Sequence, residues 1–376
     1  MYRGDGEEVG TPARLVRETF ELPPCGPDQM LAEPVFGCWE GNMDHGLTRK
    51  PIDICRHRGE DKVVVGNAGV IRITEVGRDV TRFSPGQHAI VFPSSVVDSF
   101  GYPEKMLGYD AAGTMGCLAT KLLIREHEVV PVPEGTRFGL EQWAAFSVRY
   151  ITAWANLELA LGVLRLMVSE DECPTPHVWG WGGGTTFAEL DLARRRGCVP
   201  VMISGHEGRL RAIEAAGIGA LDRRQFNTLD FDESRFCTDV GYRRRYTQSE
   251  AAFLSQVVER TKGQGVHIFV DYMGSPLLRL TLKAIGRVGV VTTAGWKEGM
   301  VINFLRASEC IERRQHVHTH YARYAQGLAA VEYAERTGWV PQLDEPVTRF
   351  DDVQALADRF HAGQTGFFPV YSVNPE

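Results

Sequence analysis

The stretch that most constrains the fold of this chain is His177-Val-Trp-Gly-Trp-Gly-Gly-Gly-Thr-Thr186. A short apolar run enters a cluster of glycines, an amphipathic run follows over residues 187–197, and a second apolar run covers residues 199–204. This order predicts a strand, a tight turn, a helix and a second strand. Because glycine has no Cβ, such a turn can approach phosphate oxygens at a helix N-terminus. The segment therefore predicts a turn that holds a dinucleotide pyrophosphate, the alternative being an ordinary glycine-rich turn without a ligand.

The alternation of strands and helices continues after this turn. The pattern predicts helices over residues 207–217, 251–262 and 276–286, and strands over residues 265–271 and 289–294. Residues 222–248 are polar, charged and aromatic, and we interpret them as an insertion. Strands that alternate with helices from His177 to Ala294 predict an α/β domain with a doubly wound parallel sheet.

The first third of the chain has a different pattern. From Ala13 to about Pro133, short apolar runs are separated by Gly, Pro and Asp, as in Lys62-Val-Val-Val-Gly66. This density of short strands predicts a small barrel-like or sandwich domain. A helical pattern over residues 140–159 then carries the chain toward the parallel sheet.

Composition narrows the class of protein. The chain has 376 residues and a net charge of −7, which argues against nucleic acid as a partner. The N-terminus lacks an apolar signal region and no apolar run is long enough to span a membrane, so we expect a cytoplasmic protein without a membrane partner. None of the eight cysteines has Cys-x-x-Cys spacing, which favours reduced thiols over disulfides or a four-cysteine zinc lobe.

Several motifs resemble the medium-chain dehydrogenase/reductase superfamily over nearly the whole chain. They are Gly66-Asn-Ala-Gly69, residues 75–88, Val130-Pro-Val-Pro-Glu-Gly135 and Phe360-His-Ala-Gly-Gln-Thr-Gly366. The resemblance implies a GroES-like, β-rich catalytic domain built from residues 1–150 and 318–376. It further implies a Rossmann NADP-binding domain over residues 151–317, a small-molecule or thioester-linked substrate between the domains, and a homodimer or homotetramer.

The zinc-binding motif of that superfamily is altered here. Zinc-containing members have Gly-His-Glu where this chain has Gly66-Asn67-Ala68, and their cysteine ligand falls near Cys38 or Gly41. Three protein ligands, which a catalytic zinc needs, cannot be assembled. The chain therefore resembles a zinc-independent member. The alternating histidines of His316-Val-His-Thr-His320 could bind a metal, but we expect structural or interface histidines there.

Two zinc-independent branches are similar to this chain. The glycine turn has the length that is typical of the quinone reductases, but Thr186 stands where a last glycine is usual. The insertion and residues 106–119 resemble the crotonyl-CoA carboxylase/reductases. The positions that hold carbon dioxide in the second branch are altered, so the resemblance supports reduction more than carboxylation. These positions supply the catalytic candidates, which are Glu40, Tyr109, Asp110 and Tyr272.

The end of the second predicted strand indicates the cofactor. An acidic residue there would bind the ribose hydroxyl of NAD, but the strand ends in Ser204, and Arg209 opens the next helix. A hydroxyl and a guanidinium suit the extra phosphate of NADP. The full set of predicted cofactor-binding residues is Thr152, Gly180, Gly182, Gly183, Gly184, Thr185, Thr186, Ser204, Arg209 and Ala294.

The activity that these features favour is hydride transfer from NADP(H) to an activated C=C bond of an enoyl thioester or enone. Without a metal, protein hydroxyls or amides must stabilise the developing oxyanion, and Tyr109 and Tyr272 are suitable hydrogen-bond donors. Asp110 would need a raised pKa to be the general acid, but not to be a hydrogen-bond acceptor. Trp179 and Trp181 could pack the turn against the other domain or line a cleft for an aromatic substrate. The alternatives are a zinc-less dehydrogenase of an alcohol, polyol or ketone, and a non-catalytic nucleotide-binding protein.

Overall fold

The structure is a computed structural model that describes residues 1–4, 11–295, 301–319 and 321–375. The chain divides into two compact units. The first contains Met1–Ile151 together with Ala322–Glu376, and the second contains Thr152–Tyr321. Each unit has its own sheets and its own core, and each is described by itself.

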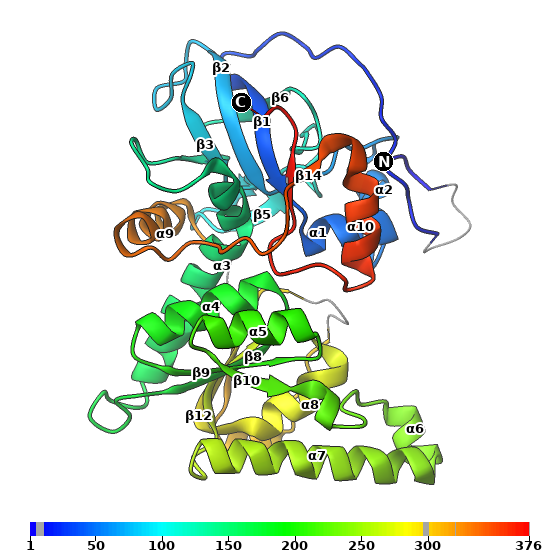
Figure 1. The fold of residues 1–376 in the computed structure, drawn as a ribbon, viewed down its shortest axis with the longest axis vertical. Coiled ribbons are helices and arrows are strands. Elements are labelled where there is room, and N and C mark those ends of the chain that lie inside the picture. Colours follow the sequence, from blue (N-terminus) through cyan, green and yellow to red (C-terminus); the bar gives the residue numbers. More distant parts are fainter. Residues whose placement is uncertain (5–10, 296–300, 320, 376) are drawn as a thin grey trace. The chain divides into compact units, whose positions relative to one another are not determined.

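The first unit is built around β1 (Gln29–Cys38), which pairs with β2 (Gly69–Val76), β6 (Leu122–Arg125) and β15 (Val370–Ser372), always antiparallel. The main sheet has the order β14-β15-β1-β2-β3-β7, with β3 (His88–Val91), β7 (Val129–Pro131) and β14 (Thr348–Arg349). A separate hairpin joins β4 (Ser94–Val97) to β5 (Pro103–Met106). The C-terminal strands thus complete a sheet that the N-terminal strands begin (Figure 1).

The helices of the first unit pack on this sheet and on its ends. They are α1 (Gly41–Thr48), α2 (Ile54–Arg58), the first half of α3 (Leu140–Arg165), α9 (Tyr324–Thr337) and α10 (Val353–His361). Aromatic side chains anchor α3, because Phe146 and Tyr150 pack on Trp339, with ring centroids 5.7 and 4.7 Å apart. This cluster ties the C-terminal segment to the helix by which the chain leaves the first unit.

The second unit has a six-stranded parallel sheet in the order β10-β9-β8-β11-β12-β13. Figure 1 shows α4 (Gly184–Arg195) and α5 (Glu207–Ala215) on one side of the sheet, and α7 (Val240–Arg260) and α8 (Ser275–Ala284) on the other. This is the 3-2-1-4-5-6 order of the Rossmann fold. The predicted doubly wound sheet is confirmed. Its strands are β8 (His177–Trp181), β9 (Val199–Ser204), β10 (Gly219–Asp222), β11 (Val266–Asp271), β12 (Ile285–Thr293) and β13 (His316–Thr319).

The predicted insertion is more helical than its composition indicates. After a short 3₁₀ turn (Arg223–Gln225), α6 (Glu233–Thr238) leads into α7, which begins at Val240, eleven residues before the predicted start. The side chain of Asp239 caps α7 by accepting the amide N–H of Tyr242 at 2.9 Å. Tyr246 and Phe253 are fully buried on one face of α7, so the aromatic residues are the core face of a helix and not part of a loop.

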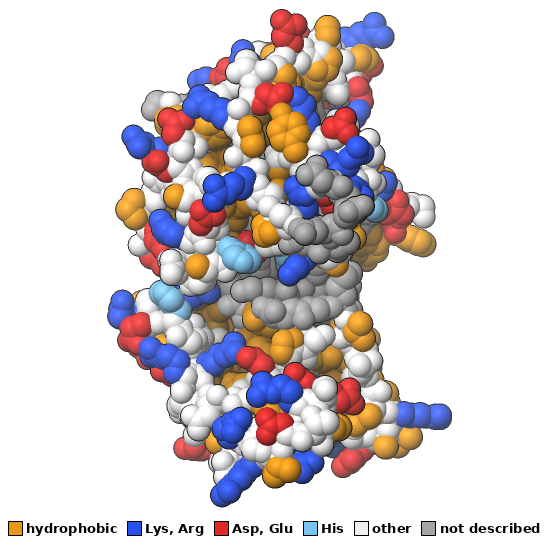
Figure 2. All heavy atoms as spheres, turned by 90° about the vertical axis from the view of Figure 1, so that its right-hand side faces the viewer, with side chains coloured by type: hydrophobic (Ala, Val, Ile, Leu, Met, Phe, Trp, Pro, Cys, Tyr) orange, Lys and Arg blue, Asp and Glu red, His pale blue; other side chains and the backbone are white. Residues whose placement is uncertain are grey.

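The surface and the thiols agree with the composition. On the face in Figure 2, the basic and acidic side chains of the described residues are interspersed. All eight cysteines are free. In the described part of the chain, no helix is both long enough and apolar enough to cross a membrane.

Candidate functional site

The glycine turn lies where β8 ends at the carboxyl edge of the parallel sheet. Gly182 has φ 145°, a left-handed conformation that favours glycine, and Gly183 is the N-cap of α4. A Cβ added at Gly183 would meet no atom within 4 Å, so open space lies beside this residue. No side chain caps α4. The turn therefore has both features that a phosphate cradle needs, which are room beside the backbone and first-turn amides without a side-chain cap.

Thr186 fills the space that the neighbouring glycines leave. Its side chain is fully buried, and Oγ1 donates to the carbonyl of Trp181 at 3.2 Å. A Cβ on Gly180 would lie 2.7 Å from Thr186 Cγ2, and a Cβ on Gly182 would lie 2.3 Å from Thr186 Oγ1. A threonine at the usual position of the last glycine is thus accommodated by the two preceding glycines.

The two tryptophans beside the turn belong to the core. Trp179 and Trp181 are 0% and 3% exposed and pack in the apolar cluster of the second unit. The Trp181 ring stacks on Phe253 of α7 at 5.5 Å. The expectation that the tryptophans line a cleft is wrong, because alternate residues of a strand point to the same face and here that face is covered by α7.

The predicted site for an extra phosphate is at the ends of β9 and β10. Ser204 accepts the amide N–H of His206 at 3.3 Å, and Arg209 lies in the first turn of α5. A second arginine, which was not predicted from the sequence, belongs to the same edge. Arg224 lies beside Gly205 and is paired with Asp222 and Glu207 at 2.7 Å each. One guanidinium thus bridges two carboxylates, and Glu207 also lies 3.6 Å from Arg211 of α5.

Of the remaining predicted cofactor residues, Thr185 is partly exposed in the first turn of α4, and Ala294 directly follows β12. Thr152 is partly buried in α3, and its carbonyl accepts a hydrogen bond from Nδ2 of Asn156 at 3.1 Å. Asn156 Oδ1 accepts the hydroxyl of Thr292 at 3.0 Å, which ties α3 to β12. This buried amide fixes the helix that carries Thr152.

Tyr272, one of the predicted catalytic residues, follows β11 at the carboxyl edge of the sheet. Its hydroxyl donates to Oε2 of Glu189 at 2.6 Å. Glu189 is fully buried in α4, and burial raises the pKa of its carboxyl to about 8, although the Tyr272 hydrogen bond acts in the opposite direction. Glu189 is not among the residues predicted from the sequence, where its only signal is an acid among the apolar residues of α4.

Glu40, the second predicted catalytic residue, is buried in the first unit. Arg149 Nη1 lies 3.0 Å from Oε1 of Glu40 and also donates to Cys38 Sγ, and Arg149 Nη2 donates to the carbonyl of Trp39 at 2.6 Å. Burial raises the pKa of Glu40 to about 7, and the guanidinium of Arg149 opposes this rise. Burial likewise raises the pKa of the Cys38 thiol to about 12, so the thiol stays protonated.

Tyr109 and Asp110 lie in a turn after β5 that Arg58 organises. Arg58 donates to the carbonyls of Tyr109 at 3.3 Å and Thr114 at 2.8 Å, and it pairs with Glu60 at 2.8 Å. Tyr109 packs in the apolar cluster that contains Trp39, the neighbour of Glu40. Asp110 accepts the amide N–H of Met106 at 2.6 Å. Asp110 is thus a hydrogen-bond acceptor that closes the turn.

Some buried polar groups of the first unit have no hydrogen-bond partner among the described residues. They include both side-chain amide atoms of Asn67, which is 1% exposed, and the hydroxyl of Tyr371, which is 0% exposed. A Cβ on Gly66 would lie 3.2 Å from the Tyr371 hydroxyl. Since a buried polar group without a partner is destabilising, such groups are typical of places that a ligand or water completes.

The histidine and metal candidates are distributed as follows. His316 and His318 lie on β13, and His320 lies outside the described residues. Across residues 1–4, 11–295, 301–319 and 321–375, no three His, Cys, Asp or Glu side chains are grouped so that they could hold a metal ion.

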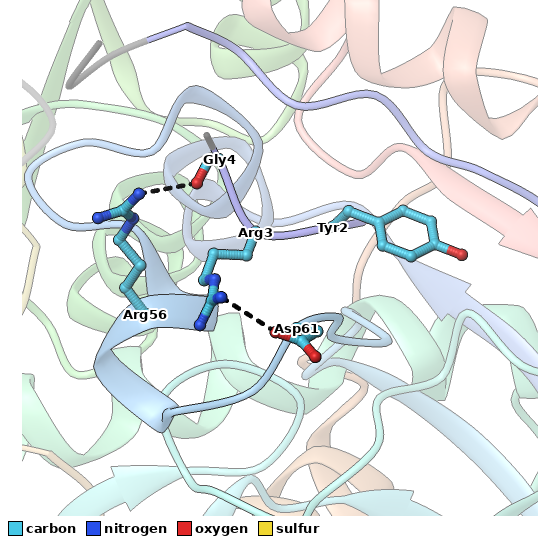
Figure 3. Close-up of a pocket in the computed structure, with 5 residues that line it drawn as sticks. All are labelled: Tyr2, Arg3, Gly4, Arg56 and Asp61. Carbon is cyan, nitrogen blue, oxygen red and sulfur yellow. Dashed lines mark hydrogen bonds and ion pairs between the residues drawn. The ribbon is translucent and has the colours of Figure 1, made fainter. Parts of the chain in front are cut away.

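Two pockets of the first unit are separate from the predicted residues. One, of about 720 Å³, is lined by Tyr2, Arg3, Gly4, Arg56 and Asp61 (Figure 3). Its arginines are already engaged, because Arg3 pairs with Asp61 at 3.2 Å and Arg56 donates to the carbonyl of Gly4 at 2.8 Å. The other, of about 940 Å³, lies under the N-terminal segment 15–25. Glu40, Tyr109 and Asp110 line neither pocket.

Comparison with known proteins gives matches among solved structures. No family model matches the sequence, and no curated protein matches it. The crotonyl-CoA carboxylase/reductase AntE in complex with NADP has a TM-score of 0.79 at 21% identity, over 100% of this chain and 98% of AntE. The 2-octenoyl-CoA carboxylase reductase CinF, in complex with NADP and 2-octenoyl-CoA, has a TM-score of 0.77 at 19% identity, over 95% of this chain and 82% of CinF.

An alcohol dehydrogenase from the hyperthermophilic archaeon Aeropyrum pernix is also similar, with a TM-score of 0.74 at 17% identity over 96% of this chain and 99% of that protein. These likenesses establish the fold. The chain has the fold of the medium-chain dehydrogenase/reductases, with a GroES-like β-rich unit and a Rossmann unit, as the sequence motifs predicted.

Proposed function

We propose that this protein is an NADP(H)-dependent, zinc-independent oxidoreductase that transfers a hydride to an activated C=C bond of an enoyl thioester or enone. The observation that carries the proposal is the glycine turn at the N-terminus of α4. The turn combines open space beside Gly183 with a helix that no side chain caps, at the carboxyl edge of a 3-2-1-4-5-6 sheet. AntE and CinF, which share this fold, are enzymes of CoA thioesters and have NADP bound.

For the cofactor, we assign the pyrophosphate to residues 182–186 and the extra phosphate to Ser204, Arg209 and Arg224. Charge-assisted hydrogen bonds from a guanidinium are the strong ones, and an arginine that contacts the phosphate would favour NADPH over NADH. NADPH supplies the hydride when it is bound. The chain's own residues orient it and handle the charge and the proton that the reduction generates.

For the chemistry, we assign proton transfer to Glu40. Addition of a hydride to a C=C bond conjugated to a carbonyl leaves negative charge on the carbonyl oxygen and requires a proton at carbon. A carboxyl with a pKa of about 7 is suited to give up that proton and to regain it near neutral pH. The buried cation of Arg149 and the side-chain amide of Asn67, which has no partner among the described residues, belong to the same unit and suit the stabilisation of negative charge. Zinc independence rests on Asn67 and Ala68 in place of the histidine and glutamate of the zinc motif.

The cofactor assignment is tested by titrating the protein with NADPH and with NADH, using the fluorescence of the nicotinamide. Substitution Arg209→Ala should weaken NADPH binding about tenfold or more, because a hydrogen bond to a charged group contributes about 1.5–3 kcal/mol, and should leave NADH binding nearly unchanged. Arg211→Ala is the matched control, since Arg211 is an exposed arginine of the same helix. Equal losses for NADPH and NADH would contradict the phosphate role.

The reaction is tested by mixing NADPH with an enoyl thioester or with a ketone. We expect consumption of NADPH with the thioester only, and no change after treatment with a chelator. The second candidate function, reduction of a ketone to an alcohol, is favoured by the likeness to the Aeropyrum pernix alcohol dehydrogenase. Consumption of NADPH with the ketone alone would establish it instead.

A further inference from the structure

The carboxyl of Glu189 is in an unusual environment for a charged group. It is fully buried in α4, directly behind the glycine turn, and one of its oxygens, Oε1, has no hydrogen-bond partner among the described residues. The other oxygen accepts the hydroxyl of Tyr272 at 2.6 Å. A buried carboxylate is normally stabilised by a cation, and here a single phenol takes that place.

Among the described residues of the neighbouring strands, no cation pairs with Glu189. On β11, Asp271 is turned away, because it accepts the hydroxyl of Thr281 at 2.6 Å and the amides of Met273 and Gly274 at 3.0 Å each. On β8, His177 lies at the opposite end of the strand from the turn, and the described residues of β9 include no titratable side chain. On α4 itself, Asp191 is paired with Arg194 and Arg195 at 2.9 Å each. Burial therefore raises the pKa of the Glu189 carboxyl to about 8, so the carboxyl is mostly protonated below that pH.

The Glu189–Tyr272 pair packs against the glycine turn. A Cβ on Gly182 would lie 3.6 Å from Tyr272 Cβ, and a Cβ on Gly295 would lie 3.4 Å from it, so Tyr272 packs between the backbones that follow β8 and β12. Glu189 is also five residues after Gly184, which is about 7.5 Å along a helix axis. A negative charge on Glu189 would thus repel an anion at the turn, with little water between them to screen it.

We propose that Glu189 is a positioning residue for the dinucleotide, which in its protonated form holds Tyr272 against the glycine turn and on ionisation weakens dinucleotide binding. The proposal rests on the proposed function, because it requires that the turn bind a dinucleotide. Tyr272 then forms part of the wall of the cofactor site, and dinucleotide binding depends on the protonation of Glu189 on α4. Release of one proton from Glu189 creates a buried charge that only movement of the Glu189–Tyr272 pair, or entry of water, can solvate.

The test is the dissociation constant of NADPH measured from pH 6.5 to 9.5 in the full-length protein, Glu189→Gln and Tyr272→Phe. For the unaltered protein, we expect binding to weaken above pH 8, by up to tenfold for each pH unit. Glu189→Gln still accepts the Tyr272 hydroxyl but cannot ionise, so its dissociation constant should stay within about twofold over the range. The pH at which binding begins to weaken is called the break. In Tyr272→Phe the break should move to higher pH, because the hydrogen bond that lowers the pKa of Glu189 is lost.

The outcomes separate this inference from the proposed function. Failure of the unaltered protein to bind NADPH at any pH would contradict the proposed function. Binding with the same pH profile in the unaltered protein and in Glu189→Gln would overturn the role of Glu189 alone. If Glu189→Gln does not fold, the direction of the shift in Tyr272→Phe decides, and a break that stays in place would overturn the proposal. Repeating the titration with NADH should give the same break, since the pair acts on the turn and not on the extra phosphate.

Discussion

Each unit of this protein has a buried glutamate at its candidate site, and these two glutamates are stabilised differently. Glu40, in the first unit, has a guanidinium at 3.0 Å, whereas Glu189, in the second, has a phenol at 2.6 Å. Burial raises the pKa of both carboxyls, to about 7 for Glu40 and about 8 for Glu189. The cation holds Glu40 near the point of half-ionisation at neutral pH, and the phenol leaves Glu189 mostly protonated.

This difference indicates different uses of the same side chain. A group that is half-ionised at neutral pH can exchange a proton during each turnover, which suits Glu40 for acid–base chemistry. A carboxyl that stays protonated is a neutral hydrogen-bonding group, which suits Glu189 for holding Tyr272. Arg149 cannot lose its charge, so Glu40 and Arg149 depend on each other, whereas Glu189 and Tyr272 are both neutral at pH 7.

The largest expected effect concerns stability after removal of each carboxyl. Glu40→Met leaves the buried guanidinium of Arg149 without its counter-charge and should lower the free energy of unfolding by about 3–5 kcal/mol. Glu189→Met leaves only one hydroxyl unpaired, which is destabilising, but it also removes a carboxyl that the folded state must keep protonated, which is stabilising. The net change in the free energy of unfolding should therefore be below about 1 kcal/mol. Urea unfolding at pH 7 measures both. Equal losses would contradict the distinction between the two sites.

A smaller effect is expected in the pH dependence of stability. Both folded-state pKa values lie above the usual 4.5, so the folded protein keeps protons that the unfolded chain has released, and stability falls as pH rises through this window. The window ends at about pH 7 for Glu40 and about pH 8 for Glu189. Each group changes the free energy of unfolding by at most about 1.4 kcal/mol per pH unit.

Between pH 7 and 8, therefore, Glu189→Gln should become more stable relative to the unaltered protein, whereas Glu40→Gln should gain much less, because Glu40 is already half-ionised at pH 7. Thermal or urea unfolding at half-unit steps of pH gives the comparison. A larger gain for Glu40→Gln than for Glu189→Gln in that interval would show that the two environments have been assigned the wrong way round.

The architecture of the molecule could be predicted from the sequence because it depends on local patterns. Alternation of apolar runs with amphipathic runs predicted the parallel sheet, and the glycine cluster predicted the turn before α4. The start of α7 was missed because its first turns carry Arg243, Arg244 and Arg245, which look like an exposed loop in a polar stretch. Its buried residues, Tyr242, Tyr246 and Phe253, become visible as one face only when a helix is assumed.

The candidate site was less predictable because it depends on partners distant in sequence. Glu40 was predicted only through the family resemblance, and Tyr272 through that resemblance and its place after a strand end. Their roles in catalysis stay predictions. Their partners are harder to predict, because Arg149 has no sequence signal and Glu189 has only that of an acid among apolar residues. Both partners lie within helices, and 83 residues separate Glu189 from Tyr272. The sequence shows that Thr186 departs from the usual glycine, but the room that Gly180 and Gly182 leave for it depends on packing in three dimensions.

The central claim, hydride transfer from NADPH to an activated C=C bond, is tested most directly by following the hydride itself. The protein is mixed with an enoyl thioester and NADPH that carries deuterium at C4 of the nicotinamide, on either face in separate reactions, and the product is analysed by mass spectrometry and NMR. We predict a saturated thioester with one deuterium at the carbon β to the carbonyl, from one of the two labelled forms only. A reduced product without deuterium from either form, or no reduction of the C=C bond at all, would contradict the claim.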